Sequence, residues 1–330
     1  MAAMFRRVAA VAALLLVGGV NTGWAQDKVS ILLDYPQPEG IHAGIELALQ
    51  KGWFREAGLD AEVRDGKGSN LTIQQVAAGQ ADIGLAQLSA MAVAASNGVP
   101  VIAVMGIAQR GDLALTVADD TGVKTLKDVK GLKIGATPGS AAVALWEAFL
   151  AASGTRKGDI NLVYLDGSAQ VSAYLAKSVA GLLVTVSYFT PLVEKIRPAK
   201  AFQFSDYGLS VPSYGMVVNR ESLDKKPAQI GKVVQVLQRS WKYIVDGHEQ
   251  EGVDAIVARR ANLRPDPSVL MGMLKLNIAQ MGTAATKDRP FGWQSEEDWK
   301  QAVEVMTKAS LLKPGVKLSD LYTNRFVPAR

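Results

Sequence analysis

The chain has 330 residues, of which 48% are hydrophobic, and it carries a formal net charge of +5 with no cysteine and two histidines. The lack of cysteine excludes disulfides, thiolate metal sites, cysteine catalysis and a lipid-modified N-terminal cysteine. The mildly basic charge forms no Lys/Arg blocks and no basic-aromatic stripe, which argues against nucleic-acid binding. No cofactor and no metal site are expected.

The first 25 residues are typical of a cleaved signal peptide. Arg6 and Arg7 precede an apolar run from Val8 to Val20, and Gly23-Trp24-Ala25 has the small-x-Ala form of a cleavage site. The run is shorter than the roughly 20 residues that span a bilayer. We therefore expect cleavage after Ala25 and a soluble periplasmic protein that is not a lipoprotein.

The following residues alternate between predicted strands and helices. Strands are expected at 29–33, 59–64, 83–86 and 101–107, with helices at 41–56, 71–78 and 88–97. A second series has strands at 114–118, 133–136, 161–164, 182–186 and 201–204, with helices at 141–152, 168–177 and 190–196. This alternation predicts parallel strands with helices on both faces of each sheet, an α/β fold.

The pattern changes near Pro212. One strand is expected at 214–219, followed by helices at 230–246, 252–260, 267–281 and 295–309. Because this tail has too few strands for its own sheet, we predict that it packs on the first domain. About 300 residues exceed one comfortable core, so we predict a discontinuous domain 1 (26–111 and 210–330) and a domain 2 (112–209). Two crossings between the domains would make a hinge and leave a ligand cleft.

Three turns before predicted helices are candidate ligand sites. Each could expose backbone amides to a negative atom of a ligand, although in the first turn Ser69 or Asn70 could simply be a helix N-cap. One such turn is weak evidence, but turns divided between two facing domains support a binding site. The candidates are Ser69, Asn70, Gln87, Ser89, Thr137 and Ser140.

Polar and aromatic residues near predicted strand ends form a second group of candidates. Asp34 could accept hydrogen bonds from a ligand amine, and Tyr35 offers a ring face and a hydroxyl. Tyr188 and Tyr214 hold comparable positions, where a tyrosine is more often a packing residue.

His42 either starts its helix or faces the cleft and binds a ligand. A catalytic histidine needs a nucleophile or an orienting acid, and Asp34 is its only local partner. The chain has no Gly-x-Ser-x-Gly elbow, and two isolated histidines do not build a His-rich metal centre. We therefore expect no enzymatic activity, with a hydrolase or synthase that uses His42 as the less favoured alternative.

Short motifs run through nearly all of the chain after residue 25, namely Asp34-Tyr35, His42-Ala43-Gly44, Lys51-Gly52-Trp53-Phe54, Gly58-Leu59-Asp60, Gly66-x-Gly68-Ser69, the run from Gln74 to Gly84, Asn97-Gly98-Val99-Pro100-Val101, the run from Leu126 to Gly135, and the run from Pro191 to Lys195. Together they resemble the NMT1/THI5-like periplasmic binding proteins, relatives of the nitrate, taurine and aliphatic-sulfonate receptors of ABC importers. The resemblance implies the type II periplasmic-binding-protein fold, in which two α/β domains close on a ligand. It also implies a monomer that captures a small polar or heteroaromatic solute and delivers it to an inner-membrane permease.

The ligand is less well defined by this resemblance. The Asp34-Tyr35 and His42 pattern is similar to the branch that binds pyrimidine precursors of thiamin, but Tyr35 stands where that branch usually has Trp. The loop from Pro36 to Ile41 is one residue longer, and the segment 178–182 lacks the acid of the family's Gly-x-Val-Asp-Ala. The cysteine-rich motif of the fungal pyrimidine synthases is missing. An anion (alkanesulfonate, taurine or nitrate) therefore remains an alternative ligand, and a ligand-sensing role remains an alternative to transport.

Overall fold

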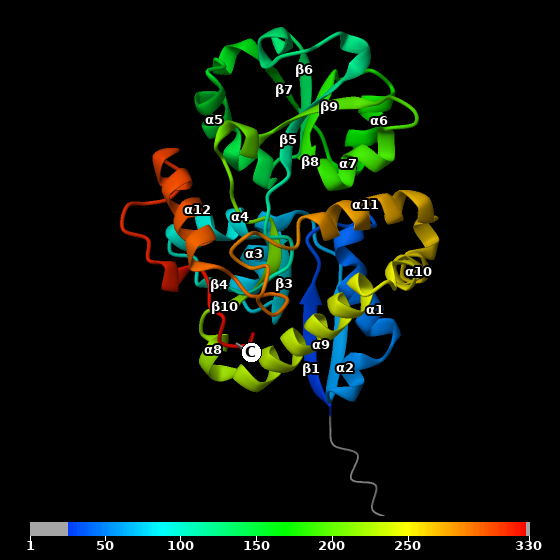
Figure 1. Ribbon diagram of the computed structural model, residues 1–330, viewed down its shortest axis with the longest axis vertical. Coiled ribbons are helices and arrows are strands. Elements are labelled where there is room, and N and C mark those ends of the chain that lie inside the picture. The colour runs from blue at the N-terminus through cyan, green and yellow to red at the C-terminus, as the bar shows by residue number, and fades with distance from the viewer. Residues whose placement is uncertain (1–25, 328–330) are drawn as a thin grey trace, which may run out of the picture.

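The computed structural model describes residues 26–327 and contains two five-stranded sheets (Figure 1). The first sheet has the order β2-β1-β3-β10-β4, built from β1 (Asp27–Leu32), β2 (Leu59–Arg64), β3 (Ile83–Gln87), β4 (Val101–Gly106) and β10 (Tyr214–Asn219). The second has the order β7-β6-β8-β5-β9, built from β5 (Leu113–Ala118), β6 (Lys133–Ala136), β7 (Asn161–Tyr164), β8 (Gly181–Thr185) and β9 (Ala199–Gln203). The predicted signal peptide lies outside the described residues.

Both sheets are mixed, so the prediction of parallel strands is wrong at β5, while no direction was predicted for β10. β1 pairs in parallel with β2 and β3, and β6 pairs in parallel with β7 and β8. β10 is antiparallel to β3 and β4, and β5 is antiparallel to β8 and β9. β5 and β10 are the two strands that the chain enters directly from the other sheet. Each of them therefore starts at the end of its sheet where the neighbouring strands finish.

The helices around the first sheet come from both ends of the described chain. They are α1 (Ala43–Gln50), α2 (Trp53–Glu56), α3 (Ser69–Ala77), α4 (Leu88–Ser96), α8 (Ser222–Lys225), α9 (Pro227–Val245), α10 (Glu249–Arg259), α11 (Pro267–Ala279) and α12 (Glu296–Lys308). α9 and α10 pack against α1, which places this part of the C-terminal tail beside the helices of the first sheet. The single helix predicted over 41–56 is wrong. The segment divides into a 3-10 turn (Gly40–His42), α1 and α2, and the break between α1 and α2 lies at Gly52, which adopts a left-handed φ of 74°.

Three α-helices pack around the second sheet, namely α5 (Ala141–Ser153), α6 (Gln170–Leu175) and α7 (Val186–Val193). The predicted start of the last helix at residue 190 is wrong, because α7 begins immediately after β8. Asp112 explains the early start. Its carbonyl accepts from the N–H of Val186 at 3.0 Å, and its Oδ2 accepts from the N–H of Ser187 at 2.8 Å. These two bonds satisfy amides that a helix start otherwise leaves unpaired.

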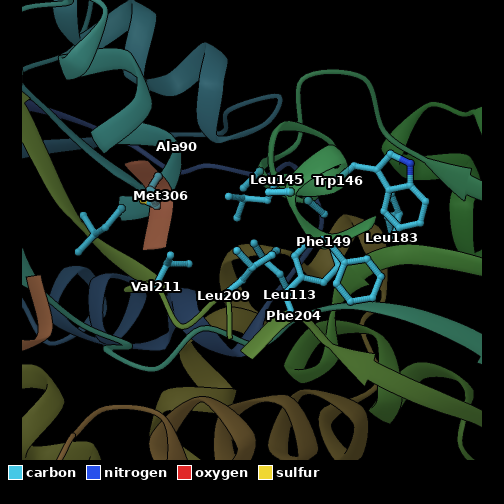
Figure 2. Close-up of a cluster of buried hydrophobic side chains, with 14 of the residues drawn as sticks. Ala90, Leu113, Leu145, Trp146, Phe149, Leu183, Phe204, Leu209, Val211 and Met306 are labelled. Carbon is cyan, nitrogen blue, oxygen red and sulfur yellow. The ribbon is translucent and has the colours of Figure 1, made fainter. Parts of the chain in front are cut away.

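An apolar seam joins the two sheets beside the segments that cross between them. Residues 107–112 lead from β4 to β5, and residues 204–213 lead from β9 to β10. Leu209 and Val211 of the second crossing belong to the same buried cluster as Ala90 on α4 and Phe149 on α5 (Figure 2). Burial of a Leu, Val or Phe side chain contributes about 1.5–3 kcal/mol, so hydrophobic packing holds the second crossing in place. None of the helices in residues 26–327 is long and apolar enough to cross a membrane.

Candidate functional site

A cavity of about 80 Å³ is lined by residues from both sheets and the loops that follow them. Eight of the eleven predicted site residues line it, namely Asp34, Tyr35, Ser69, Gln87, Thr137, Ser140, Tyr188 and Tyr214. The remaining lining residues are Glu39, Gly68, Leu113, Ala141, Ala142, Gln170, Leu183, Val184 and Thr185. The structure therefore brings together most of the two groups of candidates.

Strand direction explains why these residues meet. Asp34 follows β1, Gln87 ends β3, Thr137 follows β6 and Thr185 ends β8. In open α/β sheets the loops outside the carboxyl ends of parallel strands converge and form the ligand site. The first residue of β10, Tyr214, reaches the same place because its strand runs the other way.

Three predicted site residues do not line the cavity. His42 is completely buried behind Asp34, with its Nε2 3.3 Å from Asp34 Oδ1, and it lies in the 3-10 turn that leads into α1. Of the two roles considered for it, the structure therefore gives His42 the helix-start position and not direct access to a ligand. Asn70 is half-buried near the start of α3, and Ser89 is buried near the start of α4.

Two carboxyl groups line the cavity, and the sequence predicted only one of them. Asp34 is 4% exposed and Glu39 is 7% exposed. Burial, and then the charges of Asp34 and the nearby Asp112, raise the pKa of Glu39 well above its usual range. The sequence signal for Glu39 was its place in the loop that follows the first strand. Among the described residues that line the cavity there is no lysine, arginine or histidine.

Two amide side chains offer unpaired hydrogen-bond donors, one from each side of the cavity. Gln87 comes from the end of β3, and Gln170 is the first residue of α6. The Nε2 atom of each is buried and has no acceptor among the described residues. The Oε1 of Gln87 accepts from the hydroxyl of Ser213 at 3.3 Å. Gln170 was not predicted from the sequence, because nothing in its local sequence distinguishes it from the other residues of its helix.

The tyrosines connect the two sides of the cavity. Tyr35 and Tyr188 meet edge to face, with ring centroids 5.9 Å apart and an interplanar angle of 77°. The ring of Tyr35 also packs against Gly167, so closely that there is no room for a Cβ at that glycine. Burial raises the pKa of Tyr35, Tyr188 and Tyr214, so these phenols stay protonated and can donate hydrogen bonds.

Five helices have their first residue or N-cap at the cavity, and the starts of α4 and α7 are already occupied by the protein. Asp112 fills the start of α7, and the N–H of Leu88 in α4 donates to the carbonyl of Ser213 at 2.6 Å. At the starts of α3 and α5, the first two backbone amides have no acceptor among the described residues. These amides belong to Ser69, Asn70, Ala141 and Ala142.

The two serines at these helix starts have different roles. The N-cap of α3 is Gly68, so the assignment of Ser69 or Asn70 as its cap is wrong. The Ser69 hydroxyl instead accepts from the backbone N–H of Gln87 at 3.1 Å, which holds two walls of the cavity together. Ser140 does cap its helix, since its hydroxyl accepts from the N–H of Val143 at 3.3 Å.

A buried ion network lies near His42. Glu46 on α1 is 2% exposed, and its carboxylate oxygens lie 3.1 Å from Nε of Arg259 and 3.7 Å from Nη2 of Arg260. Arg260 also pairs with Asp65 after β2, and its Nη1 donates to the carbonyl of Pro36 at 3.3 Å. The network ties α10 to the loop that carries Tyr35 and Glu39.

Two mixed α/β units, joined by two crossings and sharing one cavity, define the periplasmic-binding-protein fold. The chain belongs to the NMT1/THI5-like family, whose model matches residues 40–251.

Comparisons over nearly the whole chain agree with this assignment. The formylaminopyrimidine-binding protein of Halalkalibacterium halodurans is 22% identical over 97% of this chain and 98% of its own length. A structure from Bordetella bronchiseptica RB50 has a TM-score of 0.74 and 20% identity, and covers 92% of this chain and 96% of that one. The alkanesulfonate-binding protein SsuA from Xanthomonas axonopodis pv. citri, bound to MOPS, has a TM-score of 0.68 and 16% identity, with coverage of 90% and 98%.

Proposed function

We propose that this protein is the solute-binding receptor of an ABC-type importer. It captures a small polar or heteroaromatic molecule between two domains and delivers it to a membrane permease. The observation that carries the proposal is the pair of Nε2 donors of Gln87 and Gln170, which have no acceptor among the described residues and face one cavity from opposite sides. A buried polar group without a partner costs about 1–3 kcal/mol. A ligand that pairs with both groups would therefore favour the closed arrangement.

The proposal includes the domain organisation predicted from the sequence. Residues 26–111 with 210–330 would form one body and residues 112–209 the other, so that the ligand site opens and closes about the two crossings. We also propose that the chain is exported to the periplasm after cleavage of residues 1–25 and acts as a monomer. The names of the Halalkalibacterium and Xanthomonas proteins support receptors for small solutes on this fold.

A pyrimidine fits the cavity better than a sulfonate or nitrate. Asp34 and Glu39 suit the amino group of a pyrimidine, and the amides of Gln87 and Gln170 suit its ring nitrogens or an oxygen substituent. Tyr35 and Tyr188 provide aromatic contact with a flat ring. An anion would have to bind beside two acidic side chains without a lining lysine or arginine.

The site supports a protein that binds its solute without converting it. His42 has no access to the cavity except through Asp34, so it lacks the direct contact with a substrate that a general base needs. Stoichiometric recovery of an unchanged solute after incubation with the protein would agree with a receptor. A product that accumulates, and that is lost in His42→Ala, would favour an enzyme.

A ligand screen tests the receptor function. Purified residues 26–330 would be melted with pyrimidines, alkanesulfonates, nitrate and aromatic acids. A ligand at about 100 times its dissociation constant adds roughly 2.7 kcal/mol of stability. Gln87→Ala and Gln170→Ala should each weaken the binding of the ligand found, while the exposed control Gln301→Ala should not. The absence of a shift with all four classes of compound would contradict the proposal.

A further inference from the structure

We propose that the cavity selects solutes that carry a positive charge, and that binding such a solute expels a proton that Glu39 holds when the cavity is empty. The inference rests on the proposed receptor function and names the charge class of its ligand.

The first observation is the imbalance of charge around the cavity. Asp34 and Glu39 line it, and Asp112, which is 2% exposed, lies near Glu39 at the end of the first crossing. Within residues 26–327, no basic side chain lines the same space. A solute in this cavity therefore meets carboxyl groups whose charges are not balanced by the protein.

The second observation is that the three acidic side chains differ in the hydrogen bonds that they receive. Asp34 Oδ1 lies 3.3 Å from His42 Nε2, and Asp112 Oδ2 accepts from the N–H of Ser187. The Glu39 carboxyl group receives no hydrogen bond from any described residue; its side chain is almost fully buried, and its oxygens keep some contact with the cavity. An unpaired buried carboxylate is strongly disfavoured, and such a group keeps its proton instead. The raised pKa of Glu39 is consistent with this geometry.

Among residues 26–327, no basic side chain lines the cavity to hold Glu39 as an anion. The titratable groups that influence it or face the same cavity are Asp34, Asp112, Tyr35, Tyr188 and Tyr214. His42 lies on the far side of Asp34. Arg260 approaches the loop through Pro36, but it is paired with Asp65 and Glu46. An arriving cation would therefore be the first positive charge that Glu39 meets at close range.

The unpaired amides at the starts of α3 and α5 do not outweigh the negative charge of the acidic side chains in the cavity. The N-terminus of a helix carries roughly half a positive charge, so the starts of α3 and α5 together amount to about one. The two acids of the cavity can carry two negative charges once Glu39 ionises. The free amides at these helix starts, with Gln87 and Gln170, are then suited to acceptor atoms elsewhere on the same solute. A protonated amidine or aminopyrimidine has both features.

The proton balance follows directly. Glu39 loses its carboxylic proton to solvent, its carboxylate pairs with the bound cation, and no other covalent bond changes. The apparent affinity should therefore rise with pH, by up to about tenfold for each unit, until Glu39 is already ionised in the empty protein or the solute loses its charge.

Three probes of one shape and different charge test the proposal. Benzamidine is a cation, benzamide is neutral and benzoate is an anion. Their binding to residues 26–330 would be measured by calorimetry at about pH 6 in phosphate, and at about pH 8 both in phosphate and in Tris, whose different ionisation enthalpies report proton release. We expect benzamidine to bind at least tenfold more tightly than benzamide, with the release of up to one proton and tighter binding at the higher pH.

A matched pair of variants assigns the effect to one residue. Glu39→Gln keeps the size of the side chain but removes the proton and the charge. It should abolish proton release and weaken benzamidine binding about tenfold or more, while benzamide binding stays within about threefold. Glu147→Gln, at an exposed position on α5, should behave like the parent protein in both measurements. Thermal melts confirm that both variants are folded.

The outcomes separate the charge class from the receptor function. Benzoate binding as tight as that of benzamidine, benzamidine binding without proton release, or no benzamidine binding at millimolar concentration would each overturn the charge proposal. In any of these cases, a neutral or anionic solute that stabilises the protein would leave the receptor function standing. The receptor function fails only if the whole ligand screen is empty and none of the three probes binds.

Discussion

The imidazole of His42 and the carboxylate of Asp34 form a buried pair, with Nε2 and Oδ1 3.3 Å apart and no part of His42 exposed to solvent. Asp34 faces the cavity and His42 stands behind it. His42 can therefore influence a ligand only by orienting Asp34, which makes it a positioning residue.

This relationship predicts that the effects of substituting His42 and Asp34 on ligand affinity are not additive. His42→Ala removes a hydrogen bond to a charged group, which is worth about 1.5–3 kcal/mol, so ligand affinity should fall by tenfold or more. In an Asp34→Ala background the same change should have almost no further effect on the dissociation constant. Calorimetric titration of the four proteins with the ligand found in the screen measures both effects. Equal losses in the two backgrounds would show that His42 acts independently of Asp34.

Glu39 should make the stability of the empty protein depend on pH. The pKa of Glu39 in the folded protein is raised above the ordinary value of 4.5. The unfolded chain therefore loses this proton first, and the stability that the group supports is complete below about pH 4.5 and declines as the pH rises toward the raised pKa. Glu39→Gln should flatten that decline and be more stable than the parent at neutral pH. Urea unfolding over a pH series compares them, and parallel curves would refute the prediction.

The close packing of Tyr35 on Gly167 predicts a variant that resists closure. A Cβ at Gly167 would overlap the Tyr35 ring, so Gly167→Ala should displace that ring and weaken ligand binding. Gly158→Ala is the matched control, because a Cβ there meets nothing within 4 Å and Gly158 also lies in a 3-10 turn of the second unit. Small-angle scattering with and without ligand should show less compaction for Gly167→Ala alone. Equal compaction and equal affinity in both variants would count against a closing contact.

The network around Glu46 predicts a large loss of stability. Arg260 is 3% exposed and pairs with Glu46 and Asp65. Arg260→Met would leave Glu46 with less compensation for its buried charge, a change of the kind that costs about 3–5 kcal/mol. Arg156→Met, at a side chain that is 78% exposed, should change the free energy of unfolding by less than about 0.5 kcal/mol. Chemical denaturation measures both, and similar losses would argue against a structural role of the network.

Local patterns predicted most elements of the fold but not the directions of all strands. Residues 133–136, 161–164 and 214–219 form strands over the predicted ranges, because short apolar runs there are bounded by turn residues. The antiparallel direction of β5 and β10 follows from where the chain crosses between sheets, and no local pattern encodes it. The break at Gly52 was missed because apolar spacing continued through it.

The same distinction applies to the candidate site. Asp34 was predicted from its place at a strand end, and Gln87 and Thr137 from turns before helices, and all three line the cavity. Glu39 and Gln170 were missed because long-range packing brings the loop and the helix start that carry them to the cavity. His42 was correctly paired with Asp34, but its position behind that residue depends on how the 3-10 turn sits against α11.

The place of β10 between β3 and β4 in the first sheet has a consequence for the order of folding. β4 forms its ladder only with β10 among the described strands, yet all of residues 113–203 lie between them in the chain. Until β10 arrives, β4 presents an unpaired edge made of Val101, Ile102, Ala103, Val104, Met105 and Gly106, all buried in the final fold. Late insertion of β10 should thus limit the rate of refolding, and β4 is the segment most exposed to aggregation in that interval.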